Sequence, residues 1–517
     1  MNALTFLTLL ATADPVTADL ILKGGTIYDG SGSPGVVGDL ALKGDRIVAI
    51  GKFAVAGQPK VIDCGGLAVA PGFIDLHTHS DEPLQHKATR QNLSYLTQGL
   101  TTAITGNCGS GPVDAAKYFA ALEKDGIGSN VIHLATHNSI RQQVMGNVNR
   151  SPTADELAKM KALVDKAMAD GAWGLSTGLI YNPGTYSKTD EIIELAKAAS
   201  AHRGIYASHM RDEGAGLLDA IRETLQIGKD AKLPVHISHI KASGRRNWGK
   251  AADAIALIES ARATGQAVTA DQYPYPASST SLKAMVIPAK YREGSAADFQ
   301  ARVADPAEGP KIKKAIEDAV DGRAGGKSLR VAQFRGNPTF NGKDIAEIAD
   351  MTKRSMVDVV LEIEKAGGAQ MVSFGMSEED VRLFMKRPWV ATASDGGSKV
   401  PDTTSVPHPR SYGTFPRKIG RYAIADGMIP LEFAIRSASG LPADILKLPE
   451  RGYLKLGWFA DVVVFDPATF RDTATFEKPH QYATGVKWLY VNGTAAIAEG
   501  KPTTVLAGRV LRHQNKD

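Results

Sequence analysis

The stretch Phe73-Ile74-Asp75-Leu76-His77-Thr78-His79 is an apolar run that ends in two histidines separated by one residue. Side chains alternate between the two faces of a β-strand, so residues two apart point to the same side. Two imidazoles on one side are suited to bind a metal ion. A His-x-His pair is a weak motif on its own, and the rest of the chain has to supply further ligands.

Later strand-like runs lead to four more side chains of the right chemistry, Cys108, His209, His239 and Asp395. Side chains at the carboxyl ends of successive barrel strands converge on one face of the barrel. Imidazole and thiolate are typical zinc ligands, and an additional carboxylate can act as a general base. The pattern therefore predicts one site, with Asp395 as the catalytic residue and with five metal ligands: His77, His79, Cys108, His209 and His239.

Strand-like and helix-like stretches alternate through the middle of the chain, which is typical of parallel strands joined by crossover helices. A helix is predicted over residues 153–169, where Thr153 and Glu156 form a capping box. The number of strands favours an α/β fold, a closed (β/α)8 TIM-type barrel. The predicted strands end near His79, Thr105, His137, Thr177, His209, His239, Tyr273 and Asp395.

Turn-rich β segments also open and close the chain. We therefore expect a small β-sandwich domain built from both chain ends, residues 1–68 and 447–517, beside a metal-dependent barrel of residues 69–446. Residues 281–374, between the last two barrel strands, are more than a crossover needs. They are predicted to form an insertion or lid over the barrel mouth, and a purely structural decoration fits the same pattern.

The composition is that of an enzyme rather than a tether. The chain has 517 residues, of which 43% are hydrophobic and 22% are charged, enough for a large core. The net charge of +5 is small and no basic block is interleaved with aromatic residues, which argues against nucleic acid as a partner. Two cysteines are too few for a disulfide scaffold.

No run approaches the roughly 20 apolar residues of a membrane helix, so no membrane partner is expected. Residues 1–13 contain a short apolar stretch but lack the basic region of a secretory signal. A cytoplasmic location is the preferred interpretation, and export stays open because of this signal-like segment.

Several segments resemble the amidohydrolase superfamily and, within it, the N-acyl-D-amino-acid deacylases, also called D-aminoacylases. The resemblance covers nearly the whole chain. It implies zinc-dependent hydrolysis of the amide bond of a small-molecule N-acyl-D-amino acid, which releases a carboxylate and a D-amino acid. The segments that carry it are Pro71–Asp81, Gly106–Gly109, Gly174–Leu179, Ser208–Arg211, Ile237–Lys241, Asp271–Tyr275 and Ser394–Gly396.

Many superfamily members bridge two metals with a lysine on the fourth strand, but residues 172–179 contain none. The resemblance implies that Cys108 replaces this lysine. Its thiolate, with His209 and His239, would hold one tightly bound zinc ion. A second, weaker zinc position would share Cys108 and be completed by His77 and His79.

The resemblance further implies that Lys241, Tyr273 and Ser279 bind the α-carboxylate of the substrate. A cation with hydroxyl donors suits a carboxylate, although Lys241 as a solvated lysine and Tyr273 as a core residue are the plain alternatives. His408, Arg410 and Arg417 follow Asp395 in the chain and are further candidates for the barrel mouth. His137 ends the third predicted strand and is either a substrate contact or an ordinary core histidine.

Three other functions remain as alternatives. An amidohydrolase acting on cyclic amides or dipeptides would share every ligand argument. A nucleobase deaminase is disfavoured, because residues 209–213 lack the His-x-x-Glu arrangement expected for its proton-shuttling glutamate. A non-enzymatic assembly protein on the same fold is expected to have lost ligands, whereas all of them are present.

Overall fold

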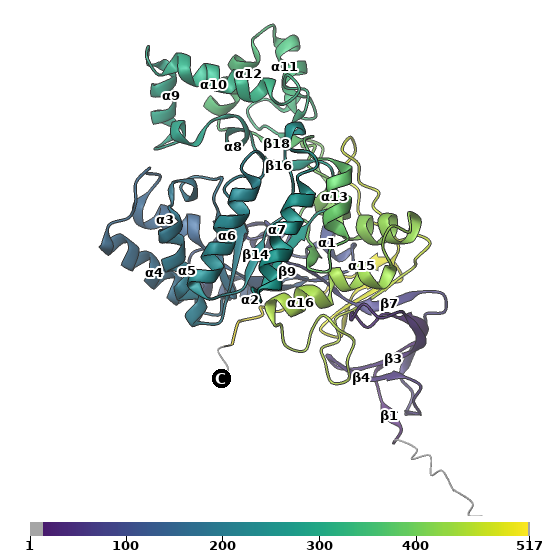
Figure 1. Ribbon diagram of the computed structural model, residues 1–517. Helices are drawn as coiled ribbons and strands as arrows, with labels where there is room; N and C mark the ends of the chain where they lie inside the picture. The colour runs from purple at the N-terminus through teal and green to yellow at the C-terminus, as the bar shows by residue number, and fades with distance from the viewer. Residues whose placement is uncertain (1–13, 515–517) are drawn as a thin grey trace, which may run out of the picture.

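The computed structural model describes residues 14–514 (Figure 1). Its central part is a barrel of parallel strands, with β10 and β11 following each other across Leu134. In chain order the strands are β8 (Phe73–Asp75), β9 (Leu100–Thr105), β10 (Asn130–His133), β11 (Ala135–Thr136), β12 (Gly174–Gly178), β13 (Ile205–His209), β14 (Val235–Ile237), β15 (Val268–Gln272) and β19 (Val390–Thr392).

Contacts just beyond the ends of β8 and β19 close the barrel. Thr78 and Gly396 form a parallel bridge. On either side of it, the His79 N–H donates to the Gly396 carbonyl at 2.6 Å and the Asp395 N–H donates to the His77 carbonyl at 2.8 Å. The expected TIM-type barrel is confirmed, and its first and last strands meet at residues predicted for the site.

Helices cover the outside of the barrel. In α4 the predicted capping box is confirmed: the Glu156 N–H donates to the Thr153 hydroxyl at 3.3 Å and the Thr153 N–H donates to the Glu156 carboxylate at 2.8 Å. The helices around the barrel are α1 (Leu93–Leu96), α2 (Ala115–Asp125), α3 (His137–Met145), α4 (Ala154–Ala169), α5 (Thr189–Ala201), α6 (Leu217–Ala231), α7 (Ala251–Ala263), α13 (Glu378–Met385), α14 (Arg410–Pro416), α15 (Leu431–Ala438) and α16 (Gly440–Leu446).

Both ends of the chain enter one nine-stranded sheet, in which β20 pairs antiparallel with β7. This arrangement confirms the small β-sandwich domain built from both chain ends, and the domain boundaries drawn from the sequence stay a prediction. The strands of the sheet are β2 (Leu20–Ile27), β3 (Val36–Lys43), β4 (Arg46–Gly51), β6 (Lys60–Asp63), β7 (Ala68–Pro71), β20 (Val462–Phe465), β21 (Val486–Val491), β22 (Thr494–Ala498) and β23 (Lys501–Pro502).

The segment between β15 and β19 forms a compact unit with its own apolar core, which includes Phe299, Ile312 and Val359. Figure 1 shows its helices α9 to α12 above the barrel. Its role as a lid is a proposal. The unit contains β16 (Ser278–Ser281), β17 (Leu329–Gln333), β18 (Gln370–Ser373), α8 (Leu282–Val286), α9 (Ala296–Ala304), α10 (Gly309–Asp321), α11 (Ile345–Thr352) and α12 (Met356–Lys365).

Within residues 14–514, no helix is long and apolar enough to cross a membrane. The signal-like segment of residues 1–13 lies outside the described residues.

A buried polar network joins the terminal sheet to the barrel. The Asp461 carboxylate accepts hydrogen bonds from Arg451, from the Asn492 N–H at 2.7 Å and from the Asn130 side chain of β10 at 3.2 Å. Arg451 and Asp461 are only 3% and 5% exposed. Removing the carboxylate charge therefore leaves a buried guanidinium without its counter-ion.

We expect Asp461→Asn to lower the free energy of unfolding by about 3–5 kcal/mol, the usual cost of breaking a buried ion pair from one side. Denaturant unfolding measures the change. Asp219→Asn is the matched control, because Asp219 forms an exposed pair with Arg222 on α6. Equal unfolding midpoints for the two variants would contradict the assignment.

Candidate active site and metal centre

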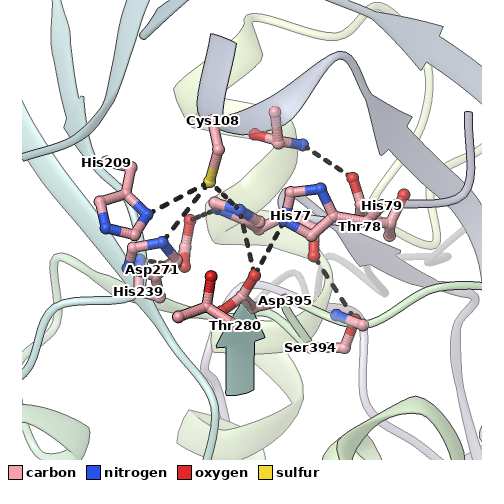
Figure 2. A network of polar contacts seen from close by, with 12 residues as sticks. His77, Thr78, His79, Cys108, His209, His239, Asp271, Thr280, Ser394 and Asp395 are labelled. Carbon is pink, nitrogen blue, oxygen red and sulfur yellow. Dashed lines mark hydrogen bonds and ion pairs between the residues drawn. The ribbon is translucent and has the colours of Figure 1, made fainter. Parts of the chain in front are cut away.

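The Cys108 sulfur lies at the centre of a group of imidazoles (Figure 2). Its Sγ atom is 3.3 Å from His77 Nε2, 3.5 Å from His209 Nδ1 and 3.6 Å from His239 Nε2. Ligands of a tetrahedral zinc ion, with bonds of about 2.3 Å to sulfur and about 2.0 Å to nitrogen, are themselves separated by roughly 3.5 Å. The donor atoms are thus spaced as zinc requires, and the residues fit the ion.

A second group of donors, formed by His77, His79, Cys108 and Asp395, shares Cys108 with the group of Cys108, His209 and His239. His79 Nε2 is 3.1 Å from Asp395 Oδ1, and His77 Nε2 is 3.5 Å from the same oxygen. The His79 side chain is 39% exposed, whereas those of His77 and Asp395 are buried. The structure therefore brings all five predicted ligands and Asp395 into one place, with the outer position more open to solvent.

Three of these residues have a left-handed backbone conformation. The φ angles are 52° at Cys108, 36° at His239 and 51° at Asp395. Residues other than glycine rarely adopt such angles, which cost of order 1–3 kcal/mol each and occur where the surrounding structure imposes them. Each lies in the turn that follows a strand, and hydrogen bonds hold it there: the His239 N–H, for example, donates to Asp271 at 2.7 Å.

The fourth strand, β12, approaches the centre through its backbone. A Cβ atom at Gly178 would lie 2.2 Å from the Cys108 carbonyl oxygen, so only glycine fits there. The Ser176 hydroxyl accepts the Gly109 N–H at 3.0 Å. Small residues on β12 therefore let the loop that carries Cys108 pack closely, and this strand contributes support rather than a ligand.

Asp271, at the end of β15, orients two of the histidines. Its Oδ2 atom is 3.5 Å from His77 Nδ1 and 2.8 Å from His236 Nε2. Burial acts to raise the pKa of Asp271, but the neighbouring imidazoles of His77 and His236 bring it well below its ordinary value. A carboxylate on the outer nitrogen fixes the ring so that the other nitrogen is free for a metal. His236 therefore serves the site indirectly, from the opposite face of β14.

Glu213 is a site residue that the sequence analysis missed. Its Oε1 atom is 2.9 Å from His239 Nδ1 and 2.5 Å from Lys241 Nζ. Burial acts to raise the pKa of Glu213, and Lys241 and His209 lower it further than burial raises it. His239 Nδ1 thus lies beside both Glu213 and Lys241, at 2.9 and 2.8 Å. The position of Glu213 four residues after His209, one turn along if the chain were helical, is the signal that the sequence offers.

Arg410 is bound to the candidate catalytic carboxylate. Its Nη1 atom is 2.6 Å from Asp395 Oδ2, and its guanidinium lies 4.9 Å from the centroid of the Tyr273 ring. Burial acts to raise the pKa of Asp395, but Arg410 and His239 hold it well below its usual range. Asp395 is therefore an ionised carboxylate with one oxygen held by Arg410 and the other directed at the histidines.

The residues predicted to bind substrate lie next to this centre. Lys241, Tyr273 and Ser279 line a cavity of about 90 Å³ that His209, His239 and Asp395 also line. Lys241 is buried and paired with Glu213, so it is not a solvated lysine. Tyr273 is also buried, and the one hydrogen bond of its hydroxyl among the described residues is to the Met376 sulfur, at 3.9 Å.

Other histidines have structural partners. His137, at the start of α3, contacts Glu191 at 3.2 Å. His408 donates to the Ala277 carbonyl at 2.9 Å. Neither ring belongs to the two groups of metal-type donors found among the described residues.

The sequence pattern of the amidohydrolase family matches residues 60–511. The chain is 39% identical to a D-aminoacylase of Alcaligenes xylosoxydans xylosoxydans, over 97% of this chain and 99% of that protein. It is 36% identical to an N-acyl-D-aspartate deacylase of the same organism, over 93% and 92%. A solved N-acyl-D-glutamate deacylase from Bordetella bronchiseptica, complexed with zinc and a phosphonate mimic of the tetrahedral intermediate, is 31% identical, with a TM-score of 0.81 over 96% of this chain and all of that one.

We expect Cys108→Ala to lose tightly bound zinc, because it removes the donor common to both groups. Zinc per chain after dialysis is measured by atomic absorption. The control is Cys64→Ala, since Cys64 is a buried thiol in the terminal domain whose pKa burial raises to about 11. His79→Ala should keep the tightly bound ion. Wild-type zinc content in Cys108→Ala would rule out the thiolate as a ligand.

Proposed function

The chain belongs to the amidohydrolase family, with the N-acyl-D-amino-acid deacylases, and from this premise we propose that it hydrolyses the amide bond of N-acyl-D-amino acids. The observation that carries the proposal is the position of Asp395. It adjoins both groups of donors around Cys108 and also lines the cavity of Lys241. A nucleophile-activating carboxylate and a carboxylate-binding cation thus lie on either side of the space for one small substrate.

We propose that Cys108, His209 and His239 hold one zinc ion and that His77 and His79 complete a weaker position. The chemistry that zinc supplies when bound is Lewis-acid activation of a carbonyl oxygen and of a water molecule. Asp271 and Glu213 lie beside the outer nitrogens of His77 and His239, at 3.5 and 2.9 Å, where a carboxylate favours the ring orientation that a metal ion needs.

Asp395 moves the proton in this proposal. Its Oδ2 atom is held by Arg410, so Oδ1, which faces His77 and His79, is the atom that takes a proton from the attacking water. The same atom then gives the proton to the amide nitrogen as the C–N bond breaks. Arg410 keeps the carboxylate in place during both transfers.

Lys241, Tyr273 and Ser279 bind the α-carboxylate. An ammonium group has three donor hydrogens; Glu213 accepts one from Lys241, and His239 Nδ1 lies 2.8 Å from the same nitrogen, which leaves a third donor. The Tyr273 hydroxyl donates only to a weak sulfur acceptor. Both groups therefore retain donors for a substrate, and burial strengthens the resulting charge-assisted hydrogen bonds.

Zinc-loaded protein should release amine from N-acetyl-D-amino acids and not from the L enantiomers. The panel also contains cyclic amides and dipeptides, which test the alternative amidohydrolase activities. Hydrolysis of D and L substrates at equal rates would refute the deacylase proposal.

Asp395→Asn keeps the shape of the side chain but cannot accept a proton, so kcat should fall by at least ~10²-fold.

We expect Lys241→Ala to raise KM for N-acyl-D-amino acids by about 10-fold or more, and much less for the corresponding α-amides. The ratio between acid and amide substrates isolates the carboxylate contact, because Lys241 also neutralises Glu213. Lys386→Ala, which removes an exposed lysine from the end of α13, is the control. Equal effects on acids and amides would remove Lys241 from the carboxylate site.

A further inference from the structure

The candidate centre lies between two cavities. The smaller one, of about 90 Å³, holds Lys241 and Tyr273. The larger one, of about 380 Å³, is lined by His79 and Cys108. Both cavities are lined by Tyr181, Ser279, Thr280 and Asp395. The scissile amide has to reach Asp395, so the two arms of a substrate extend into different cavities.

The proposed function decides which arm enters which cavity, and the inference rests on it. If Lys241 and Tyr273 bind the α-carboxylate, the amino-acid arm occupies the smaller cavity. The acyl arm then extends into the larger one. Its volume is in the range of small-molecule sites and exceeds what an acetyl group needs.

The wall of the larger cavity combines apolar surface with several polar side chains. Gln333 and Gln370 reach it from β17 and β18 of the insertion, and Ser110, Ser398 and Ser405 come from loops of the barrel. The methyl end of an acetyl group, or an alkyl chain, can form no hydrogen bond with these side chains. Ser398 and Ser405 already donate their hydroxyls to Thr89 and Asp402, so Ser110, Gln333 and Gln370 are the ones that retain donors for an acceptor further along the acyl group.

The wall also contains a lysine whose charge is not neutralised. Lys399 has no ion pair and no side-chain hydrogen bond within residues 14–514. Burial lowers the pKa of Lys399; the charge of Asp402 opposes this effect and that of Arg410 adds to it. A cation in such a position gains from an anionic ligand.

The two charged neighbours of Lys399 are already engaged. Asp402 accepts the Thr404 and Ser405 N–H groups, both at 2.7 Å, and the Ser405 hydroxyl at 2.7 Å. Arg410 is paired with Asp395. Neither takes up the ammonium charge directly.

The backbone around Lys399 is fixed to the barrel. Its N–H donates to the Ser94 hydroxyl at 3.2 Å. The preceding residue, Ser398, donates its N–H to Ser80 at 3.0 Å and its hydroxyl to the Thr89 carbonyl at 2.8 Å. The start of the lysine side chain is therefore held at the cavity wall, four residues beyond Asp395.

We propose that the larger cavity takes an acyl group with a carboxylate at its far end, such as succinyl, and that Lys399 binds this carboxylate. The substrate class is thus N-(carboxyacyl)-D-amino acids. The amide C–N bond breaks, the hydroxyl of water joins the acyl carbon and a proton joins the nitrogen. The products are a dicarboxylate and a free D-amino acid.

Three acyl groups of similar length and different charge test the proposal: succinyl, its neutral amide succinamoyl, and the cationic β-alanyl group. Each is attached to the D-amino acid that is best hydrolysed as its acetyl derivative, and kcat/KM is measured. Wild-type protein should prefer succinyl to succinamoyl by at least ~10-fold, the effect of one charge-assisted hydrogen bond.

Substitutions at position 399 should change this ratio in an order set by charge. Lys399→Arg keeps the preference, Lys399→Met reduces the ratio to near one, and Lys399→Glu shifts the preference to β-alanyl. Lys386→Met, the removal of an exposed lysine at the end of α13, should leave the ratio unchanged. Zinc content and thermal unfolding verify that each variant is folded and loaded.

The possible failures are distinguishable. If no N-acyl-D-amino acid is hydrolysed, the proposed function itself is wrong. If acetyl substrates are hydrolysed but wild-type protein treats succinyl and succinamoyl alike, or Lys399→Met keeps the ratio, the acyl assignment is overturned and the deacylase remains. If Lys399→Met weakens all three substrates equally, Lys399 serves the α-carboxylate and the two arms are assigned the wrong way round.

Discussion

The close approach of three imidazoles to one buried sulfur, that of Cys108, is the constraint on which the site depends. A metal ion at this point would require each ring to present its lone pair inward. Asp271 lies 3.5 Å from the outer nitrogen of His77 and Glu213 lies 2.9 Å from that of His239, whereas the outer nitrogen of His209 has no hydrogen-bond partner among the described residues. The left-handed turns at Cys108 and His239 follow from the same requirement, since they aim both side chains at one point.

Two carboxylates beside the centre are each paired with a cation. Glu213 is neutralised by Lys241, and Asp395 by Arg410. Burying these carboxylates without their cations would be costly, so the two pairs form part of one electrostatic unit with the centre. The arrangement also links chemistry to recognition, because the lysine that balances Glu213 lines the cavity proposed for the α-carboxylate. A change at Lys241 therefore reaches His239 both directly, through the 2.8 Å contact between Lys241 Nζ and His239 Nδ1, and through Glu213.

The barrel supplies the metal-type donors, and the insertion supplies part of the cavity walls. All donors of the centre come from barrel strands and the turns that follow them, whereas β16, β17 and β18 of the insertion supply cavity walls through Ser279, Gln333 and Gln370. Variation in the insertion can change the walls without moving the donors. Two relatives of similar identity to this chain, at 39% and 36%, are named for different substrates: one is a D-aminoacylase and the other an N-acyl-D-aspartate deacylase. Cavity walls that vary independently of the donors are consistent with this difference.

The sequence by itself determined the barrel and the types of residue at its mouth. Alternation along a strand and the recurrence of strands and helices are local properties, so the pairing of His77 with His79 and the strand ends at His209 and His239 were readable from spacing. The meeting of Lys241 with Glu213 and of Arg410 with Asp395 was decided only in the tertiary structure. These contacts join loops whose conformation depends on long-range packing, and no spacing along the chain encodes which loops meet. For the same reason Lys399 cannot be told from the other lysines in the sequence, and only the folded chain shows that its ammonium group has no ion pair within residues 14–514.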